Sequence, residues 1–423
     1  MISVATTEVE DVAVDDEWNL SDSEEYLMHT IHAYPAKFPA FIASKAFDYA
    51  QQEGVDVEKV ADVFCGCGTV ALEAKLHGKD FWGCDINPVA TLIAKTKSES
   101  YKTETLDRYC RRIRVSFERV EVPQNAYTVS NERLQYWFTE NSYTALYRLK
   151  QSIEQEVPRG KYRDAFLCLF SSILKASSRW LTKSIKPQID PNKREIDVVK
   201  TFYIQFQKFI HAIDQVQDHE IAKSEIEIAT ENFLEPHKLR KVDLIISSPP
   251  YVTSYEYADL HQLSTLWLDY ADDYRDLRKG SIGSVYNSTG FSLDLDSLNA
   301  VGREVVQNLL NNKKATAQVR SVGRYYLDMQ RAIHQCSSML NNAGMAFFVV
   351  GDTEYMGVKV KNSVHLIQCL TNEGFTDIKA AKRRISNKLL TPYRDSIGRF
   401  SSDKSQRTVY HEEYVISGRM WRQ

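Results

Sequence analysis

The stretch Val60-Ala-Asp-Val-Phe-Cys-Gly-Cys-Gly-Thr69 begins as a short apolar strand and runs into a turn that contains two glycines. A helix is expected from Val70 to Leu76, with Gly78 closing it. Asp80 to Asp85 is a second expected strand, and Pro88 opens another helix, because proline suits the first helical turn. Strands that alternate with helices in this way predict a doubly wound α/β sheet.

Five later segments complete the expected sheet. Glu225–Thr230 is one strand, and the apolar runs Val242–Ser247 and Met345–Val350 are typical of strands that are buried on both faces. Lys379–Ser386 and Thr408–Ser417 are expected to form an antiparallel pair at the end of the chain. The sequence therefore predicts a mostly parallel, Rossmann-like sheet with an antiparallel terminal strand.

These strands divide the chain into regions. Residues 29–100 and 225–423 are expected to form one α/β domain, interrupted by 101–224, where apolar residues recur at helical spacing. Residues 1–28 are expected to be a flexible leader. Residues 271–323 are rich in Gly, Ser, Asn and charged residues, which predicts a loop-dominated insertion.

The leader carries much of the negative charge. The chain has a net charge of −3, but its first 25 residues hold nine Asp or Glu and no Lys or Arg. Removing those nine negative charges leaves +6 for the remainder, which is compatible with a nucleic-acid partner.

Several classes of protein are disfavoured. No apolar run approaches the roughly 20 residues of a membrane helix, and the first residues lack the pattern of a signal peptide. The odd number of cysteines, seven, is typical of reduced thiols in a cytoplasmic protein. Cys65, Cys67 and Cys84 lack the spacing of a metal site, so no metal is expected.

The first glycine turn has the features of a cofactor site. Gly66 and Gly68 would let the backbone approach a ligand, and Asp85 can accept hydrogen bonds from ribose hydroxyls at the end of the next strand. The third glycine of a dinucleotide site is missing, because Thr69 and Ala71 follow. This disfavours a nicotinamide or flavin cofactor.

Asp62–Thr69 and Gly83-Cys-Asp-Ile-Asn-Pro88 closely resemble the D-P-F-x-G-x-G-T and G-x-D-x-x-P segments of amino-group DNA methyltransferases, with Val63 in place of the usual proline. Upstream, His32-Ala-Tyr-Pro-Ala-Lys-Phe-Pro39 resembles the segment that closes over the cofactor in that family. The resemblance implies S-adenosylmethionine as cofactor, with Asp85 on its ribose and Ile86 beside its adenine. The residues that it assigns to the cofactor are Tyr34, Lys37, Phe38, Asp62, Phe64, Cys65, Gly66, Gly68, Thr69, Asp85, Ile86, Asn87 and Ser248.

A second turn follows the apolar strand Val242–Ser247 and reads Ser248-Pro249-Pro250-Tyr251. An aromatic amino nitrogen is a poor nucleophile, and acceptors around its two N–H bonds would free its lone pair. The Ser248 hydroxyl and the Pro249 carbonyl are suitable acceptors, while the two prolines bring no competing N–H donor. Tyr251 offers a face on which a flipped base can stack.

Ser at position 248 resembles the cytosine-N4 branch of the family, although adenine-N6 enzymes share this architecture. Methylation at C5 of cytosine needs a cysteine after a proline, and the chain has no such dipeptide. We therefore expect a site-specific DNA (cytosine-N4)-methyltransferase, with adenine N6 as the alternative.

A base in duplex DNA must leave the stack to reach such a pocket, so other residues must hold the double-stranded DNA. The helical region 101–224 is the expected target-recognition region. Its candidate DNA-binding residues, with one that follows the second turn, are Lys175, Arg179, Lys183, Lys186 and Tyr255. Lys175, Arg179 and Lys183 recur every four residues, which predicts a basic stripe on one helix. A solvated helix face is the competing interpretation of this spacing.

The resemblance also implies a restriction–modification system, in which a cognate restriction endonuclease would be a partner. Two other functions stay open on the sequence. The first is methylation of an RNA base, although no appended RNA-binding module is evident. The second is a catalytically silent nucleic-acid-binding protein, which the complete turns at Gly66 and Ser248 disfavour.

Overall fold

The computed structural model describes most of the chain. The described residues are 1–5, 9–19, 25–35, 37–217, 223–235, 238, 240–252, 256–284, 286, 291–311, 316–355, 357–385, 393–394, 403, 407–408 and 412–422.

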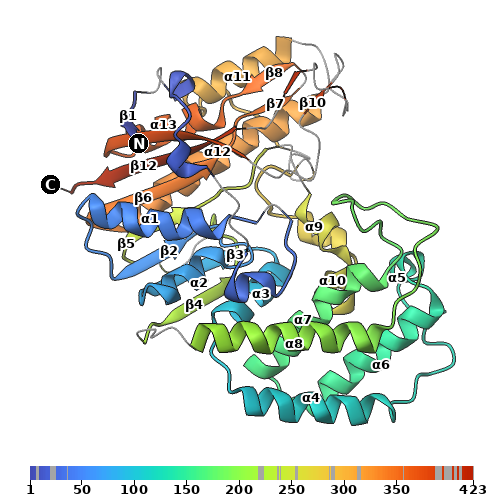
Figure 1. Cartoon of the computed structure of the whole chain (residues 1–423). Helices are drawn as coiled ribbons and strands as arrows, with labels where there is room; N and C mark the ends of the chain where they lie inside the picture. The colour runs from blue at the N-terminus through green and yellow to red at the C-terminus, as the bar shows by residue number, and fades with distance from the viewer. Residues whose placement is uncertain are drawn as a thin grey trace.

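An eight-stranded sheet forms the centre of the molecule (Figure 1). Its strands, in spatial order, are β1 (Ile2–Ser3), β9 (Phe375–Arg384), β12 (Glu412–Met420), β6 (Leu340–Val350), β5 (Val242–Ser247), β2 (Lys59–Asp62), β3 (Asp80–Asp85) and β4 (Ile226–Thr230). The strands from β6 to β4 pair in parallel, and β12 runs antiparallel to both β6 and β9. The predicted sheet is confirmed, including its antiparallel terminal strand.

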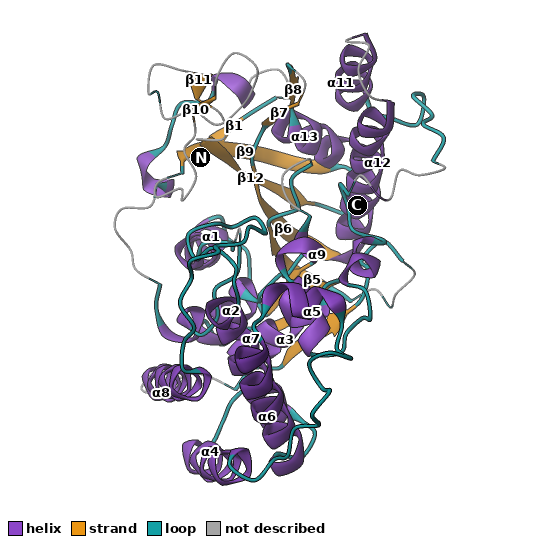
Figure 2. Ribbon diagram, turned by 90° about the vertical axis from the view of Figure 1, so that its right-hand side faces the viewer, coloured by secondary structure: helices purple, strands orange, loops and turns teal. Residues whose placement is uncertain are grey.

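Helices cover both faces of this sheet (Figure 2). One face packs against α1 (Ala40–Gln52), α2 (Thr69–Leu76) and α3 (Pro88–Ser98), and the other against α12 (Thr316–Met339) and α13 (Asn362–Asn372). Successive residues of β6 alternate between the two cores, because strand side chains point to opposite faces in turn. The central strands are therefore buried on both sides, as their apolar composition predicted.

The region 101–224 is helical in its described residues, as expected. It contains α4 (Thr103–Phe117), α5 (Glu132–Trp137), α6 (Glu140–Glu156), α7 (Lys161–Ser177) and α8 (Val198–Gln217). Their buried faces share one core with residues of α3 and of α10 (Gln262–Trp267), which follows the Ser248–Tyr251 turn. The helical region is thus packed directly on the segment that carries the candidate active site (Figure 1).

The segment 1–28, expected to be a flexible leader, contacts the sheet through several residues that the structure describes. β1 adds an edge strand to the sheet, with Ile2 opposite Ala380. Val9 is fully buried in the core, and Trp18, 2% exposed, contacts the ring of Phe347 at 5.4 Å between ring centroids. Scattered apolar residues anchor this segment in spite of its acidic composition.

The prediction of a loop-dominated insertion over 271–323 is wrong for the second half of this range. α11 (Ala300–Asn311) buries its apolar face against α12, which begins within this range. The first half contains a short 3-10 helix at Tyr274–Arg278.

The remaining elements are α9 (Tyr257–Leu260), 3-10 helices at Val9–Asp11, Asp16–Trp18 and Leu27–Thr30, and the paired strands β7 (Thr353–Tyr355) with β8 (Val358–Val360) and β10 (Tyr393–Arg394) with β11 (Arg407–Thr408). None of the helices in the described part of the chain has the length and apolar character needed to cross a membrane.

Candidate cofactor and active site

The two sequence turns meet at the carboxyl edge of neighbouring parallel strands. β2 pairs with β5, and the chain continues from β2 to β3 on one side of this pair and from β5 to β6 on the other. Immediately beyond the paired residues, the Ser247 hydroxyl donates a hydrogen bond of 2.6 Å to Asp62 Oδ1. Ligands of open α/β sheets bind at such a reversal of strand order.

Two carboxylates lie at this edge. Asp62 also accepts a 3.1 Å hydrogen bond from the backbone of Phe64, and desolvation raises its pKa to about 7 against the lowering effect of Ser247. Desolvation likewise raises the pKa of Asp85 to about 6. Two desolvated carboxylates favour a positively charged ligand over an anionic one.

The glycine turn is held to Asp85. The backbone N–H of Gly66 donates to Asp85 Oδ2 at 3.0 Å, and that of Asn87 donates to Oδ1 at 2.8 Å. Gly68 adopts φ +75°, and a Cβ there would lie 2.6 Å from the Cβ of Ala94. Gly68 therefore allows α2 to pack closely on α3, while Asp85 fixes the shape of the turn.

The segment around Tyr34 does lie over this turn. A Cβ built at Gly66 would meet only the Tyr34 ring within 4 Å, with Cε1 at 3.8 Å, and Tyr34 stacks on His261 at 4.8 Å between ring centroids. His32 ties the segment to α7 through a 3.0 Å hydrogen bond with Ser171. The upstream segment and the glycine turn are thus brought together, as the resemblance implied.

Two members of that segment have other contacts. The Lys37 ammonium binds the Glu25 carboxylate and donates to the His29 carbonyl at 3.0 Å, and desolvation lowers its pKa. Phe38 packs against the core beneath α1 and α2. In the structure both side chains hold the segment in place.

The remaining predicted cofactor residues have distinct positions around the turn. The Phe64 ring meets Phe233 edge-on at 6.2 Å, and Cys65 is buried, which raises the pKa of its thiol well above the usual value. Asn87 caps α3 by accepting a 3.0 Å hydrogen bond from Val89 N. Ile86 lies directly beside Gly280, on a segment that follows the second turn.

Some buried oxygen atoms near the glycine turn and the end of β4 have no hydrogen-bond partner among the described residues. They include Thr69 Oγ1, at the start of α2, and Glu231 Oε1, just after β4. The Glu231 backbone donates to the Asp85 carbonyl at 3.1 Å, so the end of β4 lies next to the end of β3. Buried polar atoms left unpaired are costly, which makes them candidate ligand contacts.

Sequence reasoning missed Glu231 and its neighbour Asn232. A usable signal existed, because both follow the expected strand Glu225–Thr230, and ligands gather at the carboxyl ends of such strands. Glu413 was also missed: it accepts a 3.1 Å hydrogen bond from the Tyr251 hydroxyl. That hydrogen bond joins residues 162 positions apart, so no local sequence pattern predicts it.

The second turn is fixed from the neighbouring strand. The Ser248 hydroxyl donates to the Val349 carbonyl at 3.0 Å, and its side chain also forms a hydrogen bond with the Tyr251 hydroxyl. Its oxygen can still accept a hydrogen bond, because a hydroxyl has two lone pairs. The Tyr251 ring lies against Gly351, where a Cβ would come within 3.1 Å of Cε2. Pro249 is buried and Pro250 partly buried between these anchors.

The predicted basic stripe is wrong as a helical feature. α7 ends at Ser177, so Arg179 and Lys183 lie beyond the helix that carries Lys175. Lys175 donates to the Ser184 carbonyl at 2.8 Å, and Arg179 donates to the Gln135 carbonyl at 3.1 Å. These two side chains hold the loop that follows α7.

Two further DNA candidates, Lys183 and Lys186, are exposed in that loop. Tyr255 lies outside the described residues. All seven cysteines are buried and free, and no cluster of three or more His, Cys, Asp or Glu suited to a metal ion occurs in the part of the chain that is described.

No family model matches the chain. It is 22% identical over 397 residues to a type II methyltransferase, M.MvaI, from Kocuria varians, and the alignment covers 87% of this chain and 86% of that protein. Solved structures with weak similarity include a SAM-dependent methyltransferase from Methanosarcina mazei, with a TM-score of 0.32, 9% identity and coverage of 93% of this chain and 100% of that one. Another is the rRNA methyltransferase aviRa from Streptomyces viridochromogenes, with a TM-score of 0.31, 9% identity and coverage of 92% and 88%. These TM-scores are too low to support an argument about the fold, which the strand order of the sheet defines.

Proposed function

We propose that the chain transfers a methyl group from S-adenosylmethionine to an exocyclic amino nitrogen of a base in DNA, and that this atom is N4 of cytosine. The observation that carries the proposal is the 2.6 Å hydrogen bond between Ser247 and Asp62. It joins the strand that ends in Ser-Pro-Pro-Tyr to the strand that ends in the glycine turn. A methyl donor and a flipped base would therefore meet between the two turns.

The residues around the glycine turn suit this cofactor. Its sulfonium and ammonium charges would be stabilised by Asp62 at the methionine end, while Asp85 would accept hydrogen bonds from the ribose hydroxyls. Thr69 and Glu231 have buried oxygen atoms free to bind polar groups of the ligand. When bound, the cofactor supplies an activated methyl group on sulfur.

The second turn suits an amino nitrogen as acceptor. Because Ser248 gives its hydrogen to the Val349 carbonyl, its oxygen would accept a hydrogen bond from the target amino group. The Pro249 carbonyl would accept the other. Both contacts draw the nitrogen towards a tetrahedral geometry, and in-line positioning would supply much of the rate.

The choice of DNA and of cytosine rests on the likeness to the type II methyltransferase from Kocuria varians and on serine at position 248. Adenine N6 is the alternative within the same mechanism, and an RNA base is a more distant one. The helical region 101–224, which packs against α10 beyond the catalytic turn, would carry the contacts that select the DNA sequence. A restriction endonuclease with the same recognition sequence would be its functional partner.

The experiment compares transfer of label from methyl-labelled S-adenosylmethionine to unmethylated genomic DNA and to ribosomal RNA. Incorporation into DNA alone supports the proposal. Incorporation into RNA alone contradicts it and favours the alternative substrate. Loss of DNA incorporation in Ser248→Ala, with cofactor binding retained, would assign the activity to this turn.

A further inference from the structure

The segment Arg278–Ser284, which we call the strap, lies between the candidate cofactor site and the catalytic turn. At one end, a Cβ built at Gly280 would lie 2.9 Å from Ile86 Cδ1 and 3.3 Å from Asn232 Nδ2. Only a residue without a side chain lets the backbone approach these two residues so closely, and Gly280 also has φ +84°. The strap therefore closes over the ends of β3 and β4.

The other end of the strap touches the catalytic turn. A Cβ at Gly283 would lie 3.6 Å from Val252 Cα and 3.9 Å from the Tyr251 carbonyl oxygen. From α12, Ser321 donates its hydroxyl to the Gly283 carbonyl at 3.3 Å. A single short segment thus contacts both halves of the candidate site.

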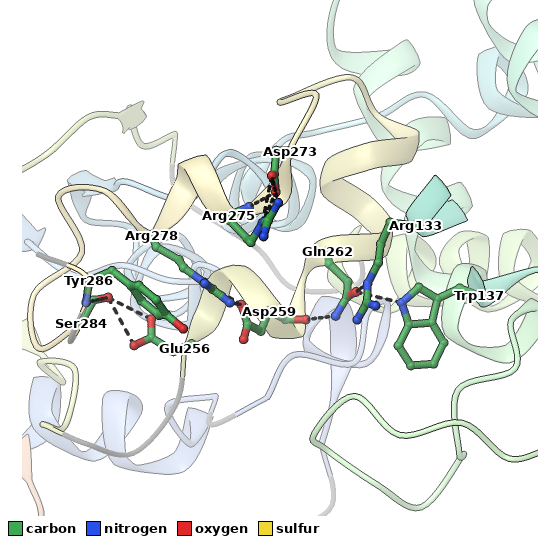
Figure 3. A network of polar contacts seen from close by, with 10 residues as sticks. All are labelled: Arg133, Trp137, Glu256, Asp259, Gln262, Asp273, Arg275, Arg278, Ser284 and Tyr286. Atoms are coloured by element: carbon green, nitrogen blue, oxygen red, sulfur yellow. Dashed lines mark hydrogen bonds and ion pairs between the residues drawn. The ribbon is translucent and has the colours of Figure 1, made fainter. Parts of the chain in front are cut away.

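The strap is held by α9 and the residue before it (Figure 3). Arg278 donates through Nε and Nη2 to Asp259 Oδ1 at 2.9 and 2.6 Å, and its guanidinium lies 4.1 Å from the centre of the Tyr286 ring. The Ser284 hydroxyl contacts the Glu256 carboxylate, with the shorter distance 3.0 Å. The Arg278 side chain is 12% exposed and that of Asp259 29%, so water screens this pair less than an open surface pair.

Gln262, the first residue of α10, holds α9 in place through its hydrogen bonds. Gln262 is fully buried, and its side-chain oxygen accepts hydrogen bonds from Arg133 Nε at 2.7 Å and Trp137 Nε1 at 2.8 Å. Its amide nitrogen donates to the Asp259 carbonyl at 2.7 Å (Figure 3). Asp259 is thus attached to α5 of the helical region through its backbone and to the strap through its carboxylate.

We propose that the strap forms the outer wall of the adenosine end of the cofactor site, and that Asp259 and Glu256 are positioning residues that keep it closed. The inference rests on the proposed function, because it takes the ligand beside Ile86 to be S-adenosylmethionine. Loosening the Arg278–Asp259 pair would leave the wall open for more of the time. The cofactor would then bind less tightly, even in the absence of DNA.

The test measures the Kd of S-adenosylmethionine by isothermal titration calorimetry on the full chain without DNA. Asp259→Asn keeps the shape of the side chain and removes its charge, and it should raise the Kd about five- to tenfold. The matched control is Asp273→Asn, which breaks the exposed pair between Arg275 and Asp273 in the same stretch and should change the Kd by less than about twofold.

Two further variants guard against a folding defect in Asp259→Asn, which circular dichroism would reveal. Ser284→Ala removes only a hydroxyl and should raise the Kd by about threefold. Arg278→Lys keeps the charge and should retain most of the affinity. If the wild type binds the cofactor and Asp259→Asn and Ser284→Ala bind it equally well, the strap is not its wall. If the wild type binds none, the proposed function itself is wrong.

Discussion

The Ser248 hydroxyl donates its hydrogen to the Val349 carbonyl oxygen, 3.0 Å away on the neighbouring strand. The bond fixes the serine oxygen at the carboxyl edge of β5 and β6 and leaves its lone pairs as acceptors. Because the Ser248 hydroxyl gives its hydrogen to the Val349 carbonyl, it can accept a hydrogen bond from a ligand. The sheet thus holds the Ser248–Tyr251 turn, the proposed catalytic turn, in a preorganised conformation.

Ser248→Ala removes this acceptor. We expect the rate of methyl transfer to fall by about 10²-fold or more, since a single preorganised contact in an active site has effects of this size. The Kd for S-adenosylmethionine should change much less than the rate, because the glycine turn is intact and Ser248 is only one of the residues assigned to the cofactor. Single-turnover kinetics and calorimetry measure the two quantities.

The matched control for that variant is Ser172→Ala on α7, where the serine hydroxyl also donates to a backbone carbonyl, that of Leu169 at 2.7 Å. It should leave the transfer rate unchanged. Equal losses in both variants would mean that Ser248 acts only through folding.

Gly68→Ala should lower the free energy of unfolding by about 3 kcal/mol, since the new Cβ would clash with Ala94 at a positive φ. Gly54→Ala is the comparison, because Gly54 has φ +72° and a Cβ there meets nothing within 4 Å. That change should cost only about 1 kcal/mol. Urea denaturation measures both, and equal costs would contradict the packing role assigned to Gly68.

Cofactor binding should depend on pH through Asp62. Desolvation raises the pKa of this carboxyl to about 7 in the free protein, and a cationic ligand would favour its ionised form. Binding below pH 7 must therefore expel a proton, so the Kd for S-adenosylmethionine should fall as the pH rises from about 6 to about 8.

Calorimetry at several pH values measures this dependence. Ser247→Ala should move the profile to higher pH, because the Ser247 hydroxyl lowers the pKa of Asp62. Asp62→Asn should flatten it. A wild-type Kd that stays constant across this range would contradict the assignment of Asp62 to the methionine end.

The ring of Tyr251, rather than its hydroxyl, is expected to contact the target base. Tyr251→Phe loses the hydrogen bonds of the hydroxyl with Glu413 and with the Ser248 side chain and keeps the ring, so kcat/KM for DNA should fall only slightly. Tyr251→Ala should lower it by a factor equivalent to about 1–3 kcal/mol, the usual contribution of base stacking. If the two variants are equally impaired, the hydroxyl is the important group.

The sequence was most informative where local pattern and tertiary packing agree. The strands Asp80–Asp85 and Val242–Ser247 have the bounds that their apolar runs predicted, because both are buried between helix layers. The two turns follow from the same patterns. What brings them together is the parallel pairing of β2 with β5, which the structure shows and the sequence did not predict.

Predictions from the sequence failed where a few residues determine the local structure against the average composition or spacing of their segment. The acidic leader is anchored by isolated apolar residues such as Val9 and Trp18. The basic stripe failed because α7 stops at Ser177: the next residue, Ser178, bonds its hydroxyl to the Lys175 carbonyl at 2.9 Å and accepts from Trp180 N at 3.1 Å. Such local hydrogen bonds compete with the helix and are not visible in spacing alone.

The central claim is most directly tested by nucleoside mass spectrometry of DNA from cells without endogenous methylation that express the wild type or Ser248→Ala. N4-methylcytosine in the wild-type sample, and none with the variant, is the result we predict. N6-methyladenine instead would keep the mechanism and replace the base. No methylated amino group in DNA from the wild-type sample, with the folded protein present and able to bind S-adenosylmethionine, would contradict the proposed function.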